Sequence, residues 1–164
     1  MTGLVPSVVA LGLVALTALR VTLGRTCSVE LTAERAAASK MLAIATAIQV
    51  VHFIEEWATG FRIQFPALFG FEAIPESVFV GFNLTWIMLW IASIPLLRAA
   101  RQPAFFTAWF LALAGVLNGV AHPVMAIRTG GYFPGLISSP LIGLAGLFLW
   151  RRLLGATLGR KSRV

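Results

Sequence analysis

One short stretch of the sequence combines an amide, an imidazole and two carboxylates at helical spacing: Gln49-Val-Val-His52-Phe-Ile-Glu55-Glu56. At about 100° per residue, Glu55 falls about 60° to one side of His52 and Glu56 about 40° to the other. Gln49 falls on the Glu56 side, so the four side chains share one helix face. Because adjacent carboxylates in a medium of low dielectric constant cannot both stay ionised without a counter-charge, this face needs a proton or a cation.

A second polar pair stands in a later apolar segment, where Asn118 and His122 are four residues apart and therefore share a helix face. Pro123 follows directly and removes an amide hydrogen that would otherwise bond the carbonyl of Gly119. In an apolar medium the freed carbonyl needs a ligand, a water or a side chain as its partner. Gly115 and Gly119 have the small-xxx-small spacing that lets another helix approach closely.

Two histidines and a carboxylate are typical of a catalytic zinc site with an open position, and equally of a non-haem iron site. A divalent metal, zinc or iron, is therefore a candidate cofactor, with four candidate ligands: His52, Glu55, Glu56 and His122. The sequence holds no His-Glu-x-x-His motif, which excludes a zincin. The apolar segments offer two glutamates, which are too few for one chain to build a ferritin-type di-iron centre.

Three readings without a metal remain open. In the first, His52, Glu55 and Glu56 are the catalytic groups of an acid–base enzyme and exchange protons with a lipid-soluble substrate. In the second, Arg62 or Arg128 reaches in from the rim and supplies the counter-charge. In the third, His52 and Glu55 neutralise each other and only fix helix packing, although ionisable residues within a membrane usually have a function.

The composition indicates which elements position these groups. Of the 164 residues, 59% are hydrophobic and 12% are charged, and the mean hydropathy is +0.89. A soluble domain would carry about 25% charged residues, whereas apolar runs of about 18 residues or more can cross a bilayer. We predict an all-α, polytopic transmembrane bundle in a single domain, with five spans at residues 4–23, 41–57, 75–97, 104–127 and 132–150 and a basic tail at 151–164.

The ends of these spans carry further signals. The first run lacks a basic n-region, and Thr26 before Cys27 does not fit a lipoprotein cleavage site, so we expect this helix to be retained. Cys27 is the only cysteine, which excludes an internal disulfide. Residues 28–40 are expected to extend the second helix. Ser139 before Pro140 resembles a helix N-cap, so the regular part of the fifth helix is predicted to start there.

The basic residues are divided unequally between the connections. Eleven of the thirteen lie at the end of the first helix, in the first and third connections or in the tail, and only Arg62 and Arg128 lie in the other two. This pattern predicts a multi-pass protein of the cell membrane, with its N-terminus outside and its C-terminus in the cytoplasm. The net charge of +7 then faces membrane lipids, the expected partners; no motif for nucleic acid accompanies it.

With this topology, several polar groups lie in one layer of the membrane. His52 and His122 are both about 7–8 Å below the extracytoplasmic boundary at 1.5 Å per residue, and Asn83 lies at a similar depth. We therefore predict one site in the outer half of the bilayer. The candidate binding residues are Gln49, Asn83, Asn118, Ser139 and, from the rim, Arg62 and Arg128.

The order of these motifs resembles a known family. The sequence His52-Phe-Ile-Glu55-Glu56, the later Asn118-x-x-x-His122 and a Tyr-x-Pro-Gly turn at residues 132–135 are similar to the bacterial integral membrane proteins named for an HXXEE motif. The resemblance covers roughly residues 41–150. It implies a polytopic membrane protein in which the motif's histidine and two glutamates have a functional role, and it implies no particular reaction.

The residues favour a metal-dependent or acid–base enzyme acting on a lipid-like or isoprenoid-like substrate. The rival interpretation is a small transporter or ion-binding protein that uses the carboxylates as a coupling site. A transporter needs polar groups that continue to the cytoplasmic face, where the sequence offers little beyond Ser93 and Thr107; a homo-oligomer could build such a path between subunits. The phenylalanine-rich stretch at residues 59–71 is expected on the outer interface, as a lid over the site or as a simple connection.

Overall fold

The computed structural model describes residues 2–26 and 30–159, so Cys27 and the tail residues Arg160, Lys161 and Arg163 lie outside the described residues. The described chain is almost entirely helical. Its elements in order are η1 (Thr2–Leu4), α1 (Val5–Leu23), β1 (Arg25–Thr26), α2 (Thr32–Thr59), α3 (Phe61–Ala67), α4 (Glu76–Arg98), α5 (Gln102–Thr129), α6 (Ser139–Gly155) and β2 (Leu158–Gly159).

Four helical segments are long and apolar enough to cross a membrane: Thr2–Leu23, Thr32–Thr59, Glu76–Arg98 and Gln102–Thr129. They correspond to the first four predicted spans, and the predicted extension of the second helix is confirmed from Thr32 to Lys40, because α2 begins at Thr32. The fifth apolar run is divided. Residues before Ser139 form a turn, and α6 begins at Ser139, where the regular helix was predicted to start, and has 17 residues; its N-cap residue is Ser138 rather than the predicted Ser139.

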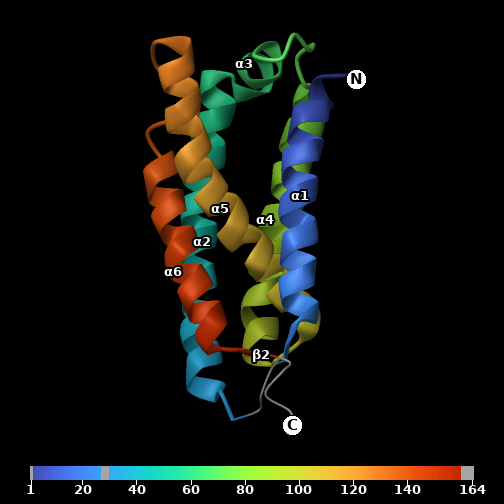
Figure 1. Ribbon diagram of the computed structural model, residues 1–164, viewed down its shortest axis with the longest axis vertical. Coiled ribbons are helices and arrows are strands. Elements are labelled where there is room, and N and C mark those ends of the chain that lie inside the picture. Colours follow the sequence, from blue (N-terminus) through green and yellow to red (C-terminus); the bar gives the residue numbers. More distant parts are fainter. Residues whose placement is uncertain (1, 27–29, 160–164) are drawn as a thin grey trace.

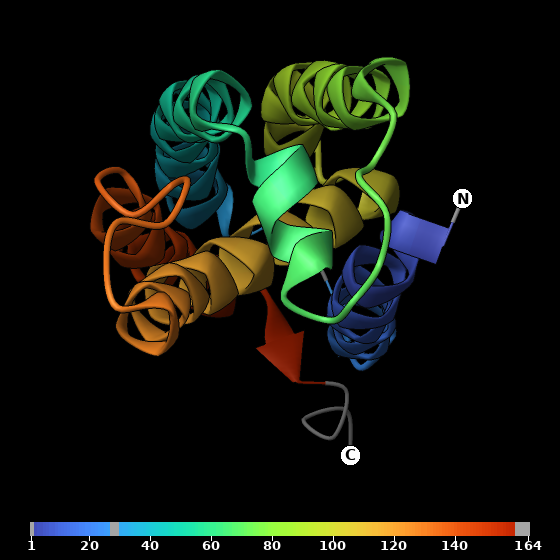
Figure 2. The same cartoon turned by 90° about the horizontal axis from the view of Figure 1, so that it is seen from above.

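The helices form a bundle in which α5 crosses obliquely between the others (Figures 1 and 2). It packs most extensively against α6, and it also contacts α1 and α4. The second helix packs between α4 and α6. Near the end of the bundle where α3 lies (Figure 2), side chains of α2 and α5 meet, with Glu56 of α2 3.4 Å from His122 of α5.

Glycines allow α5 and α6 to approach closely. A Cβ atom on Gly119 would lie 2.7 Å from the Cα of Gly143, and one on Gly115 would lie 2.8 Å from the carbonyl oxygen of Ile142. Both distances are shorter than any normal contact, so neither position accepts a side chain without moving a helix. The small-xxx-small pair predicted from the sequence is therefore a helix–helix contact, and it fixes α5 against α6.

Two glycines also end the helices that carry the polar residues. Gly60 follows α2 with φ +85°, and Gly130 follows α5 with φ +73°, the left-handed conformation common just after a helix. These stops place His52 and His122 in the last turns of their helices, next to the connections that fold over the end of the bundle.

The opposite end is held by a small clasp. In it β1 pairs antiparallel with β2, with Arg25 opposite Gly159 and Thr26 opposite Leu158. The Arg25 guanidinium donates to the Thr157 hydroxyl (2.6 Å). The clasp and the connection between α4 and α5 lie at one end of the molecule, and α3 and the turn before α6 lie at the other (Figure 1).

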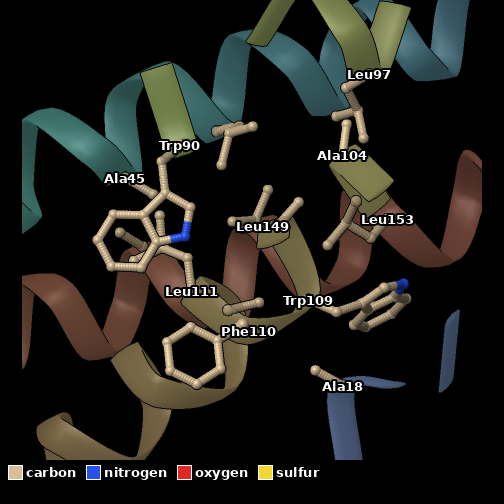
Figure 3. Close-up of a cluster of buried hydrophobic side chains, with 14 of the residues drawn as sticks. Ala18, Ala45, Trp90, Leu97, Ala104, Trp109, Phe110, Leu111, Leu149 and Leu153 are labelled. Carbon is tan, nitrogen blue, oxygen red and sulfur yellow. The ribbon is translucent and has the colours of Figure 1, made fainter. Parts of the chain in front are cut away.

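All five long helices contribute to the apolar core, as the labelled residues in Figure 3 show: Ala18, Ala45, Trp90, Leu97, Ala104, Trp109, Phe110, Leu111, Leu149 and Leu153. The polar groups nearby bond to one another. The Ser93 and Thr107 hydroxyls are 2.7 Å apart, and the Trp90 indole donates to the Thr107 carbonyl (3.0 Å). These bonds join α4 to α5 and leave the polar atoms satisfied.

Candidate metal centre

Three buried side chains converge between the last turns of α2 and α5. The side chains are His52 and Glu56, one turn apart on α2, and His122 on α5, and each is at most 6% exposed. Oxygen Oε1 of Glu56 lies 3.6 Å from Nε2 of His52 and 3.4 Å from Nε2 of His122. One ligand atom from each residue lies within 4.8 Å of the others, so this group could hold a metal ion.

The proton on the His122 ring is fixed by the turn before α6. Nitrogen Nδ1 lies 2.6 Å from the carbonyl oxygen of Pro134. A carbonyl can only accept a hydrogen bond, so Nδ1 carries a proton, and in the neutral ring Nε2 keeps its lone pair. That lone pair is on the side of Glu56.

The proton on the His52 ring is fixed by Ser138, from the same turn. The Ser138 hydroxyl lies 2.8 Å from Nδ1 of His52, and it donates its single proton to Oε2 of Glu55. It must therefore accept a hydrogen bond from Nδ1, which in the neutral ring leaves the lone pair of His52 on Nε2. Both imidazoles thus turn an unprotonated nitrogen toward the same oxygen of Glu56.

Glu55 has a different environment from its neighbour Glu56. Its Oε1 accepts hydrogen bonds from the Tyr132 hydroxyl (2.7 Å) and from the backbone N–H of Ile137 (2.9 Å). Its Oε2 accepts from the backbone N–H of Ser138 (2.8 Å) and from the Ser138 hydroxyl. Glu55 therefore binds the turn at residues 132–138 to α2, whereas Glu56 belongs to the group that could hold a metal.

Gly135 lets this turn lie against both histidines. Its φ is +86°, which disfavours any side chain, and a Cβ atom would lie 2.6 Å from Cε1 of His122 and 3.0 Å from Cε1 of His52. The imidazole rings stand nearly perpendicular, with centroids 4.9 Å apart. The turn is thus a wall of the site, which is formed by α2, α5 and the residues before α6.

Asn118 lies next to the three converging groups. Its Nδ2 is 3.3 Å from Nε2 of His52, so the amide can donate to that lone pair. The face of α5 that carries Asn118 and His122 therefore meets the face of α2 that carries His52 and Glu56, as the spacing in the sequence predicts. Gln49 is buried on α2, two turns before Glu56.

The other candidate residues have partners elsewhere. The Asn83 amide donates to the Phe79 carbonyl of its own helix (3.0 Å), and Ser139 donates to the carbonyl of Leu136 (3.0 Å). Arg62 lies 3.6 Å from a carboxylate oxygen of Glu76. Arg128 is exposed at the end of α5. The structure thus brings together His52, Glu55, Glu56, Asn118 and His122. Asn83, Ser139 and Arg62 are held by other contacts, and Arg128 lies at the surface.

Three groups of the site were not among the residues singled out from the sequence: the Tyr132 hydroxyl, the Pro134 carbonyl and the Ser138 hydroxyl. All belong to one irregular turn, whose contacts depend on how α6 returns to α2. The Tyr-x-Pro-Gly pattern indicated a turn there but carried no information on its contacts. Ser139 before Pro140 indicated a helix start, but nothing in that signal assigned the preceding Ser138 to the site.

Aromatic rings cover the site from α3. The Phe61 ring lies 5.5 Å from that of His122 and 6.1 Å from that of Phe133, and it stacks on Phe65 at 4.9 Å. The stretch expected to be a lid or a connection is thus a short helix that lies over the end of the bundle (Figure 2). Its rings make an apolar wall against the His122 side of the site.

Comparison with known proteins adds a family and no reaction. No curated protein and no solved structure matches the chain. The family model described as "Protein of unknown function with HXXEE motif" matches residues 43–149, which include α2 from its fourth turn, α3, α4, α5 and most of α6. The histidine and two glutamates of that motif are His52, Glu55 and Glu56, so the chain belongs to the HXXEE family.

Proposed function

We propose that the protein is a multi-pass enzyme of the cell membrane that binds a divalent metal, zinc or iron, and acts on a lipid-like or isoprenoid-like substrate. Its protein ligands are His52, Glu56 and His122. The four apolar helices support membrane insertion, and α6, with 17 residues, is at the lower limit of about 17–25 residues for a fifth span. The charge distribution supports a site in the extracytoplasmic half.

The convergence of two imidazole lone pairs on one carboxylate oxygen carries this proposal. When both rings are neutral, each carries its proton on Nδ1 and turns an unprotonated Nε2 toward Glu56. Ligands bound tetrahedrally at about 2.0–2.1 Å from zinc are about 3.3–3.4 Å apart. The observed separations of 3.4 and 3.6 Å fit that spacing closely. A cation would turn the repulsion between a buried carboxylate and two lone pairs into attraction.

Three protein ligands leave a coordination position for water or substrate. A metal in this position would act as a Lewis acid on a substrate oxygen or lower the pKa of a bound water to about 7. The Asn118 amide, 3.3 Å from Nε2 of His52, would then be free to donate to an oxygen at the open position. The aromatic cover from α3 fits an apolar substrate.

The polar groups in the other half of the bundle favour an enzyme over a transporter. A transport path through one chain would need polar groups that are available to an ion along the whole bundle. Ser93 and Thr107, which the sequence offered for such a path, bond to each other and to helix carbonyls. They therefore stabilise the contact between α4 and α5.

Metal analysis tests the proposal. The full-length protein, purified in detergent without chelator, is expected to contain about one zinc or iron per chain. His52→Ala, His122→Ala and Glu56→Gln each remove one ligand and should reduce the metal content to background, because two ligands rarely retain a labile ion. Glu76→Gln changes an exposed glutamate of α4 and should keep the metal. A metal-free wild-type protein that also binds no added zinc or iron would overturn the proposal.

A further inference from the structure

Glu55 and Glu56 are adjacent in the sequence but have different tasks. We propose that Glu55 is a positioning residue rather than a metal ligand: through the Ser138 hydroxyl, it keeps His52 in the tautomer whose Nε2 is free to bind the metal. This inference rests on the metal centre proposed above. Glu56 then supplies the only carboxylate ligand among the described residues.

The hydrogen bonds of Glu55 argue against direct coordination. Its Oε1 accepts from the Tyr132 hydroxyl and the Ile137 N–H. Its Oε2 accepts from the N–H and the hydroxyl of Ser138. A metal bound to either oxygen would displace donors and leave backbone N–H groups without a partner. That loss is costly at Ser138, which is buried. Glu55 is therefore already fully engaged by protein donors.

The direction of the hydrogen bonds gives Glu55 its effect on His52. The hydroxyl of Ser138 has one proton, and while Glu55 accepts it, Ser138 presents a lone pair to Nδ1 of His52. If Glu55 no longer accepted that proton, the hydroxyl would be free to donate to Nδ1. The imidazole proton would then move to Nε2, where Oε1 of Glu56 is the acceptor 3.6 Å away. A protonated Nε2 cannot bind a metal.

The outer shell of a metal site commonly works in this way, because a group that accepts the second N–H of a histidine ligand fixes its tautomer and ring orientation. In this site the two histidines have separate outer partners. His122 donates to a backbone carbonyl of Pro134, which no side-chain substitution removes. His52 depends on Ser138 and Glu55, so its tautomer alone should respond to substitutions there.

The chain suits a direct measurement, because His52 and His122 are its only histidines. Full-length protein labelled with ¹⁵N-histidine is placed in lipid nanodiscs at pH 8, above the ordinary histidine pKa of about 6.5. Nitrogen NMR of the metal-free protein then reports which ring nitrogen carries each proton. Two substitutions break the proposed link, Ser138→Ala and Glu55→Gln. The matched control is Ser139→Ala, which makes the same change at the next buried serine.

We expect both histidines of the wild-type protein to carry their proton on Nδ1. In Ser138→Ala and in Glu55→Gln, the His52 proton should move to Nε2, while the His122 signals stay unchanged and show that the site is still folded. Ser139→Ala should alter neither ring. A wild-type His52 protonated on Nε2, or a His52 that keeps its Nδ1 proton in both variants, would overturn the inference.

Titration with Co²⁺ compares the two glutamates in the same preparations. Glu55→Gln should weaken Co²⁺ binding about 10–100-fold, as loss of an outer-shell partner does, and keep the absorption spectrum of the wild-type complex. Glu56→Gln should change or abolish that spectrum. If Glu55→Gln changes it as Glu56→Gln does, Glu55 is a ligand and the inference is wrong. If the wild-type protein binds no metal while the tautomers respond as expected, the proposed function fails and the control of His52 by Glu55 stands.

Discussion

Gly135 is the residue on which the geometry of the proposed metal centre depends most directly. It combines φ +86° with imidazole atoms of both histidines within 3.0 Å of the position that a Cβ would take. Any side chain would be strained by the backbone angle and would also push the turn away from His52 and His122. The turn could then no longer hold the ring protons of the two histidines.

We expect Gly135→Ala to destabilise the protein by about 3 kcal/mol, from about 1–2 kcal/mol for a left-handed alanine plus about 1–3 kcal/mol for overpacking. Gly130→Ala is the matched control, because Gly130 has φ +73° but nothing within 4 Å of the added Cβ. It should cost about 1–2 kcal/mol and keep the metal. Unfolding in detergent and metal content measure both effects, and equal losses in the two variants would contradict this role of the turn.

The sequence predicted the polar face of each helix at this scale, because helical spacing fixes which side chains of one helix lie together. It did not predict the roles of Glu55 and Glu56, which lie about 100° apart around the helix axis. Their roles differ because Glu55 meets the turn before α6 and Glu56 meets α5. Contacts with Tyr132 and Ser138 come from residues 77 and 83 positions away in the chain, and local spacing contains no information about them.

At the scale of elements, the contact between α5 and α6 sets the position of the site. The helix α5 carries His122, and α6 follows directly from the turn that carries Ser138. Gly119 and Gly143 are in backbone contact, so the two helices are held at a fixed separation. A wider separation would draw the turn away from the end of α5.

Gly119→Ala should therefore destabilise the protein by about 1–3 kcal/mol, the usual cost of an overpacked contact, and weaken metal binding. Gly81→Ala is the matched control within α4, where nothing lies within 4 Å of the added Cβ. It should be neutral or stabilise by up to about 1 kcal/mol, because alanine favours the helix over glycine. Thermal unfolding in detergent distinguishes the two, and a neutral Gly119→Ala would show that the helices can separate without loss.

The bounds of the elements followed from composition with one exception. The runs at 4–23, 75–97 and 104–127 closely match α1, α4 and α5. The fifth run was predicted as one span from residue 132, and the structure forms a regular helix only from Ser139. Hydropathy does not distinguish an apolar turn from an apolar helix. The boundary between the turn and α6 therefore depended on the local signals of Pro134, Gly135 and the Ser139–Pro140 pair.

At the scale of the whole molecule, the two ends of the bundle differ in the number of basic residues that they carry. Arg62 and Arg128 lie at the end covered by α3, and Arg101 lies at the end with the clasp (Figure 1). In the orientation predicted from these charges, the first two face the outside and the third faces the cytoplasm. That orientation also places the metal centre near the outer surface.

Single cysteines at these positions test the orientation in intact cells. In a Cys27→Ser background, cysteines at positions 62 and 128 should react with a membrane-impermeant maleimide, and a cysteine at position 101 should react only after the cells are opened. Position 101 in opened cells is the control for expression and reactivity. Reaction at all three positions in intact cells would overturn the proposed topology, and the reverse pattern would place the site on the cytoplasmic side.

The clasp between β1 and β2 has a consequence for biosynthesis. Thr26, next to the end of α1, pairs with Leu158, which the ribosome adds 132 residues later. A nascent chain that enters the membrane helix by helix therefore releases α1 into lipid before its fastening strand exists. The helix is suited to lie in lipid without that strand. It has the highest mean hydropathy of the four candidate spans, 2.1, and only 6% of its most apolar window is buried in the fold. The strand that fastens α1 is thus the last of the described elements to be made.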